Sequence, residues 1–149
     1  MATEGNHLIR PARLSDAQSI GGLLAELGYP DVVANVRARL EGLNARDDAG
    51  VLVAEVDGQV AALAAYQVMR LLERPQPQCR VTTLVVHAGA RRRGLARALL
   101  AGIEAIAKET GCFRLEVTTQ AHRTDAAALY LALGFRERPR RLVKPLVSS

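Results

Sequence analysis

Residues 84 to 97 combine an apolar run, a short basic loop and the expected start of a long helix. They read Leu-Val-Val-His-Ala-Gly-Ala-Arg-Arg-Arg-Gly-Leu-Ala-Arg, with four arginines and no acidic residue. The first turn of a helix has backbone N–H groups without partners inside the helix, and the helix dipole adds partial positive charge there. Small residues let a phosphate approach these groups. The segment is therefore predicted to bind pyrophosphate.

Two common phosphate-binding motifs are absent from this segment. It lacks the Gly-x-x-x-x-Gly-Lys-Ser/Thr pattern of nucleoside triphosphatases, and it lacks the Gly-x-Gly-x-x-Gly pattern of dinucleotide-binding domains. The remaining alternative is a basic helix start that is only solvated.

The positive charge of the chain is concentrated in two segments. The 149 residues carry a formal net charge of +5, and 18 of the 20 basic residues are arginines. Residues 91–97 contribute +4 and residues 136–144 another +4, so the rest of the chain sums to −3. With only five aromatic residues, single-stranded nucleic-acid binding by base stacking is disfavoured. The pattern favours a small polyanionic ligand, with no nucleic-acid partner.

Composition predicts one globular domain over residues 1–149. The length is sufficient for a single core, and no apolar run approaches the roughly 18 residues of a membrane span. The N-terminus lacks a signal-peptide pattern. Two cysteines and three scattered histidines give no metal-ligand spacing, so no metal site is predicted. We expect a soluble, reduced, cytoplasmic protein without a membrane partner.

Hydrophobic periodicity and turn residues predict a mixed α/β chain without internal repeats. Ser15 and Gln18 have the spacing of a capping box at the start of the first helix. The expected helices cover 15–27, 31–43, 92–110 and 125–133, counted from their capping residues where these were identified. The expected strands cover 7–13, 51–56, 59–69, 80–87, 113–119, 135–137 and 142–146.

Two motifs in this arrangement resemble those of the GNAT N-acetyltransferases. Arg91-x-x-Gly94-x-Ala96 after a Val-rich strand is similar to the acetyl-CoA motif of that superfamily. The run from Ala126 to Phe135, Ala-x-x-Leu-Tyr-x-x-Leu-Gly-Phe, is similar to its second signature. The order of elements also matches the fold over nearly the whole chain.

The resemblance implies an α/β (α+β) GNAT fold with a mixed central sheet of six to seven strands and about four helices. The central strands at 80–87 and 113–119 would splay apart and hold acetyl-CoA as the cosubstrate. The cofactor-binding residues implied in this way are Leu84, Val85, Val86, Arg91, Arg92, Arg93, Gly94, Leu95, Ala96, Arg97 and Arg123.

The implied reaction is direct attack of a primary amine, on a small molecule or a peptide, on the thioester carbonyl. Tyr130 matches the position of the general acid that protonates the leaving thiolate, and a strand amide near Val85 or Val86 would stabilise the oxyanion. Many relatives carry a Glu on the first central strand, where this chain has Val81-Thr82-Thr83. The base therefore stays open: the candidates are Glu116, Glu55, His87 and His122, and an amine that is already partly neutral needs none.

The acceptor amine is not identified by the sequence. Its site would be built from residues 27–43, 71–78 and 136–144. A homodimer through the terminal strands is a further expectation from the resemblance. The main alternative function is a non-catalytic acyl-CoA-binding or regulatory module.

Overall fold

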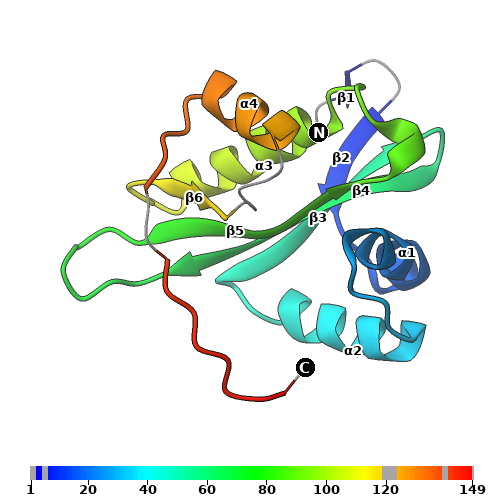
Figure 1. The fold of residues 1–149 in the computed structure, drawn as a ribbon, viewed down its shortest axis with the longest axis horizontal. Coiled ribbons are helices and arrows are strands. Elements are labelled where there is room, and N and C mark those ends of the chain that lie inside the picture. Colours follow the sequence, from blue (N-terminus) through cyan, green and yellow to red (C-terminus); the bar gives the residue numbers. More distant parts are fainter. Residues whose placement is uncertain (1–2, 5–6, 119–123, 139–140, 149) are drawn as a thin grey trace. The chain divides into compact units, whose positions relative to one another are not determined.

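A mixed β-sheet, with its strands in chain order, organises the first part of the molecule (Figure 1). The computed structural model describes residues 3–4, 7–118, 124–138 and 141–148. Neighbouring strands are antiparallel except for the last pair, which is parallel. The strands are β1 (Thr3–Glu4), β2 (His7–Pro11), β3 (Ala49–Val56), β4 (Gln59–Met69), β5 (Gln78–Val86) and β6 (Leu115–Val117).

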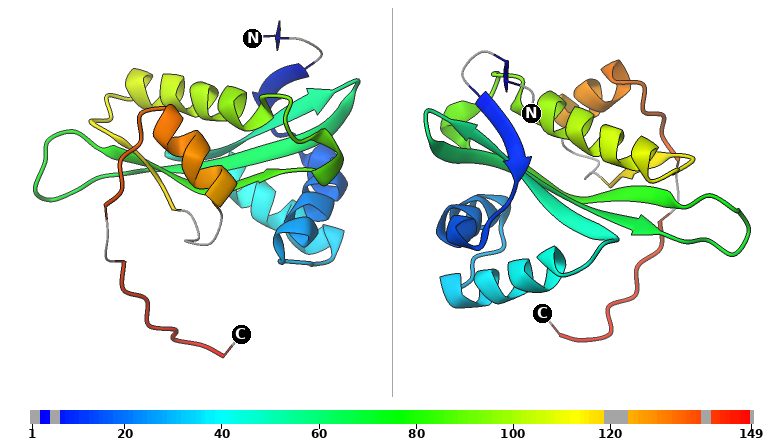
Figure 2. Two further views of the ribbon diagram at one scale, coloured as in Figure 1. Left: turned by 45° about the horizontal axis from the view of Figure 1, so that its top comes forward. Right: turned by 180° about the vertical axis from the view of Figure 1, so that it is seen from behind.

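The chain divides into two compact units, Met1–Thr118 and Thr119–Ser149. In the first unit α1 and α2 pack on one face of the sheet and α3 packs on the opposite face (Figure 2). The second unit contains α4. The helices are α1 (Ala17–Leu27), α2 (Val33–Asn44), α3 (Leu95–Glu109) and α4 (Thr124–Ala132), and short 3₁₀ turns cover Leu14–Asp16 and Ala88–Ala90.

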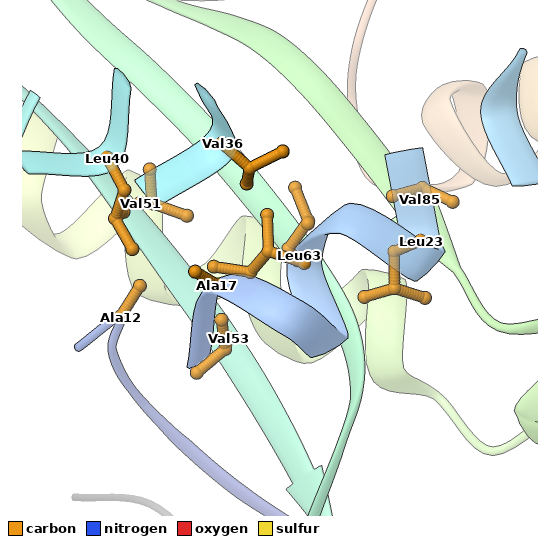
Figure 3. Close-up of a cluster of buried hydrophobic side chains, with 10 residues drawn as sticks. Ala12, Ala17, Leu23, Val36, Leu40, Val51, Val53, Leu63 and Val85 are labelled. Atoms are coloured by element: carbon orange, nitrogen blue, oxygen red, sulfur yellow. The ribbon is translucent and has the colours of Figure 1, made fainter. Parts of the chain in front are cut away.

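The hydrophobic core under α1 and α2 is formed by small and branched aliphatic side chains (Figure 3). Val51 and Val53 of β3 are buried there, and alternation along the strand sends Gly50 and Leu52 to the opposite face. On that face a Cβ added to Gly102 of α3 would lie 2.9 Å from Leu52 Cδ1, so helix and sheet are in close contact. Burial on both faces fixes the register of the sheet.

The mixed sheet and the four helices agree with the sequence expectation, but the expected six to seven strands are not confirmed. β1 contributes only two residues, so five strands form the body of the sheet. The terminal strands predicted at 135–137 and 142–146 are wrong, because residues 135–138 and 141–148 contain no strand. Leu142 and Leu146 are 95% and 89% exposed, so their apolar pattern is not matched by burial.

A buried arginine sets the start of α1. Arg10 of β2 donates two hydrogen bonds to the Asp16 carboxylate, at 2.7 and 2.9 Å, and one at 2.6 Å to Glu55 of β3. The same Asp16 carboxylate accepts the backbone N–H of Arg13 at 2.7 Å. Asp16, rather than the predicted Ser15, therefore caps this turn. The hydrogen bonds from Arg10 hold the pKa of Asp16 below its usual value.

Candidate active site

One edge of β5 is left open in its second half. β5 pairs with β6 only through Cys79, Arg80 and Val81, whereas the strand continues to Val86. In the described part of the chain, residues 82–86 therefore have a strand partner on the β4 side only. The described pairing of β5 with β6 thus ends at Val81 and Val117, and the splaying of the central strands stays a prediction.

The backbone amides along this open edge can be assigned from the pairing with β4. The N–H of His87 donates to the carbonyl of Ala61 at 2.8 Å. Ala61 directly precedes Ala62, the β4 residue that is paired with Val86. Because amide directions alternate along a strand, the N–H groups of Leu84 and Val86 point away from β4, toward the open edge. Two of the three strand residues predicted to bind the cofactor therefore present donors there.

A bulge in β5 lies at the point where β5 and β6 separate. Ala65 of β4 is opposite Thr83, but the next β4 residue, Tyr66, is opposite Val81, so Thr82 is an extra residue. A bulge of this kind increases local twist and redirects the strand. Thr82 is exposed.

The basic loop between β5 and α3 contains two residues with left-handed backbone. Gly94 has a φ of 75° and Arg92 a φ of 67°. The side chain of Leu95 is 2% exposed and anchors the first turn of α3 in the core. Leu95 can therefore offer its backbone N–H, but not its side chain, to a ligand.

The helix start has the free donors that the sequence predicted. The first intrahelical bond of α3 runs from Ala98 N to Gly94 O at 3.0 Å, so the N–H groups of Leu95, Ala96 and Arg97 precede the helical ladder. Arg91, Arg92, Arg93 and Arg97 are exposed, and none forms a salt bridge with a residue in the described ranges. Backbone donors and guanidinium groups together suit a pyrophosphate.

A carboxylate from α1 holds the entry to this loop. Glu26 accepts the backbone N–H of Ala88 at 3.0 Å and lies 2.5 Å from Nδ1 of His87. The His87 hydrogen bond is the main reason that the pKa of Glu26 is lowered. His87, one of the candidate bases, is thus engaged at one nitrogen, and its Nε2 lies beside Gly89. The sequence contained no local signal for this contact.

The candidate base Glu116 is held by two arginines. Its Oε1 accepts a hydrogen bond from Nε of Arg80 at 2.6 Å, and its Oε2 lies 3.5 Å from Nη2 of Arg114. Glu55, another candidate, is bonded to the buried Arg10. Both carboxylates are therefore engaged in ion pairs. The structure brings Glu116 to the point where β5 and β6 separate, but with its oxygens occupied.

Tyr130, the candidate acid, lies in α4 of the second unit. Its ring meets Phe135 edge-on, with centroids 5.7 Å apart, and its carbonyl accepts the Phe135 N–H at 3.0 Å. The end of the second motif is therefore a compact helix terminus. Arg123 and His122 lie outside the described residues.

The unpaired strand edge, the bulge and the helix start together form the candidate active site. The family model for acetyltransferases of the GNAT family matches residues 23–135. The chain belongs to the GNAT acetyltransferase family.

Solved structures with the same fold cover nearly the whole chain. A transcriptional regulator from Bacillus halodurans C-125 is 25% identical with a TM-score of 0.85, over 94% of this chain and 99% of the other. A glucosamine-6-phosphate N-acetyltransferase from Arabidopsis thaliana is 18% identical with a TM-score of 0.84, over 96% and 100%. An aminoglycoside N-acetyltransferase in complex with CoA is 21% identical with a TM-score of 0.82, over 97% and 98%. A comparison with curated protein sequences gives no significant match.

Membrane-spanning helices and metal-binding clusters are both absent from the described ranges. None of the helices there is long and apolar enough to cross a membrane. The same residues include no group of three or more His, Cys, Asp or Glu side chains arranged to hold a metal ion.

Proposed function

We propose that this protein is an acetyl-CoA-dependent N-acetyltransferase that acetylates a primary amine of a small molecule or peptide. The observation that carries the proposal is the continuity of the open β5 edge with the helix start of α3. Leu84 and Val86 offer amides along the edge, and the first turn of α3 offers further amides beyond the basic loop. This is the order in which a pantetheine arm and a pyrophosphate require donors.

The residues fit the chemical groups of CoA one by one. The strand amides can pair with the amides of pantetheine, as a further strand would. The N–H groups of residues 95–97 and the exposed Arg91 and Arg97 can hold the phosphates, because fixed donors and positive charge meet there. Acetyl-CoA supplies the activated acetyl group as a thioester.

The chain contributes to acetyl transfer at three atoms. The β5 amide of Val86, which points away from β4, donates to the carbonyl oxygen as negative charge develops on it. The hydroxyl of Tyr130 donates its proton to the departing sulfur. The attacking amine must be neutral; since Glu116 and Glu55 are ion-paired, we assign them no proton transfer and expect the amine to arrive deprotonated or to lose its proton to water.

Release of free CoA thiol with a panel of amines tests this function. The protein is incubated with acetyl-CoA and amino acids, peptides, amino sugars and polyamines, and thiol is followed with a chromogenic disulfide. We expect amine-dependent thiol release. Arg91→Ala combined with Arg97→Ala should raise the KM for acetyl-CoA by about 100-fold or more, because each of the two charge-assisted hydrogen bonds contributes about 1.5–3 kcal/mol. Arg37→Ala, which changes an exposed arginine of α2, is the matched control.

A non-catalytic acyl-CoA-binding or regulatory module is the second candidate. Two observations favour it: one similar structure is described as a transcriptional regulator, and both candidate carboxylate bases are ion-paired. This function predicts thermal stabilisation by CoA without thiol release on any amine of the panel. That combined result would overturn the enzymatic proposal and support the binding module.

A further inference from the structure

The polar cluster at the start of β5 lies on the face of the sheet that also carries α1 and α2. A Cβ added to Gly50 would lie 2.6 Å from the hydroxyl of Tyr66, so these paired residues share a face, opposite to the buried Val51. Val81 is paired with Tyr66 and therefore shares that face as well. Its neighbour Arg80 points to the other face, under which α1 and α2 pack.

This part of the sheet face is only partly covered. The side chains of Arg80 and Glu116 are 36% and 33% exposed, and Gln67, which is opposite Arg80 on β4, is exposed. Thr82, the bulge residue where β5 and β6 separate, is exposed too. Solvent therefore reaches a polar surface directly beside the point where the central strands part.

Arg80 is held in place by one edge of its guanidinium group. Nε donates to Oε1 of Glu116 at 2.6 Å, while the two terminal nitrogens have no hydrogen-bond partner in the described part of the chain. A guanidinium group has five N–H donors in a planar fork that matches a carboxylate or a phosphate. The ion pair with Glu116 thus orients Arg80 and leaves the end of the fork available.

The surroundings of Arg80 are positively charged. Arg114 lies 3.5 Å from Glu116, and its guanidinium group, like that of Arg74, stacks over the ring of Phe113. Three arginines therefore accompany one glutamate in this linked cluster. An anion would be favoured here, and a polycation would be repelled.

We propose that Arg80 binds an anionic group, a carboxylate or a phosphate, on the acceptor amine. This inference rests on the proposed acetyltransferase function and names its substrate class. Thr82 is two residues from Arg80, about 7 Å along an extended strand. An acceptor whose anionic group is bound to the Arg80 guanidinium group can therefore place its amine beside Thr82, where the pairing of β5 with β6 has ended. Glu116 is then a positioning residue for Arg80 rather than a base.

Matched acceptor pairs test this assignment in the wild-type protein. Each pair shares one amine and differs in the anion: L-amino acids with their carboxamides, and phosphoethanolamine with ethanolamine. We expect at least a tenfold higher kcat/KM for the anionic member, because a hydrogen bond to a charged group contributes about 1.5–3 kcal/mol. The amino-acid and phosphate pairs show which anion is preferred.

The variant Arg80→Gln should abolish this preference. It should raise the KM of the anionic acceptor about tenfold or more, leave the KM of acetyl-CoA unchanged and leave the neutral acceptors unaffected. Glu116→Gln should raise the same KM without changing the pH profile of kcat. Arg46→Gln is the control, since Arg46 makes a similar bond to Asp48, 2.7 Å from Nε, on the protein surface.

Three outcomes separate the two proposals. Equal rates for charged and neutral acceptors, or an unchanged preference in Arg80→Gln, would overturn the assignment while the acetyltransferase function stands. A loss of the acidic limb of the pH profile in Glu116→Gln would show that Glu116 is the base and would also overturn it. If no acceptor of any kind releases thiol, both the function and this inference fail.

Discussion

The carboxylate of Glu26 lies 2.5 Å from Nδ1 of His87 and accepts the Ala88 N–H at 3.0 Å, so α1 is joined to the entry of the basic loop. Glu26 and His87 are 61 positions apart in the chain. Because the loop that follows carries the candidate phosphate donors, this contact links the α1 side of the sheet to cofactor binding.

Removing the Glu26 carboxylate should weaken CoA binding. Glu26→Ala removes the hydrogen bonds to the Ala88 N–H and the His87 ring, so part of the binding free energy of CoA must be spent on ordering the basic loop. We expect a roughly three- to tenfold higher Kd for CoA. Titration calorimetry measures it. Glu41→Ala, an exposed glutamate of α2, is the control. An unchanged Kd would show that the loop holds its conformation without α1.

The same contact predicts a dependence on acidity. The His87 hydrogen bond lowers the pKa of Glu26 in the folded protein, so its stabilising effect is present above the unfolded pKa of about 4.3 and is lost as pH falls through the lower folded value. The difference in melting temperature between wild type and Glu26→Ala should therefore shrink below about pH 4. A difference that stays constant down to pH 3 would contradict this account.

Arg92 has the left-handed backbone that glycine adopts at little cost. Its φ is 67°, and left-handed helical backbone costs an L-residue about 1–2 kcal/mol. Arg92→Gly should therefore raise the free energy of unfolding by about 1 kcal/mol, measured by urea denaturation. Arg93→Gly is a matched control because it removes the same charge from the same loop at a residue without positive φ. Equal effects of the two variants would refute the backbone explanation.

The buried Asp16 should be far more important for stability than a surface aspartate. Its ion pair with Arg10 has side chains 10% and 5% exposed, and loss of one partner of a buried pair costs about 3–5 kcal/mol. We expect about 3 kcal/mol for Asp16→Ala in urea denaturation. Asp48→Ala removes an ion pair with Arg46 in which the side chains of Asp48 and Arg46 are 40% and 52% exposed. It should lower the free energy of unfolding by less than about 1 kcal/mol. Similar losses for both variants would contradict the assigned role of Arg10.

The basic loop could be predicted from the sequence because all of its determinants are contiguous. Small residues, arginines and a helix start follow one another between 84 and 97, and the structure places them in that order. The positive φ of Arg92 could not be predicted, since arginine has no preference for that conformation.

Pairings between distant residues were outside the reach of the sequence pattern. Arg80 and Glu116 are 36 positions apart, and only the parallel register of β5 and β6 brings them together. Near the C-terminus the sequence pattern instead predicted an element that the structure does not contain. There the apolar residues between Leu142 and Leu146 were interpreted as a strand, but in the structure Leu142 and Leu146 are exposed and the described residues 141–148 form none.

Replacing Tyr130 tests the proposed general acid with little change in packing. Phenylalanine keeps the ring that meets Phe135 edge-on at 5.7 Å, so the fold of the helix terminus should persist. Tyr130→Phe should lower kcat about 100-fold, the usual scale for loss of an acid–base group, while the Kd of CoA changes little. Tyr66→Phe, which removes a tyrosine hydroxyl beside Gly50 in the β3–β4 part of the sheet, is the control. A kcat equal to that of the wild type would remove Tyr130 from the mechanism and leave sulfur protonation to solvent.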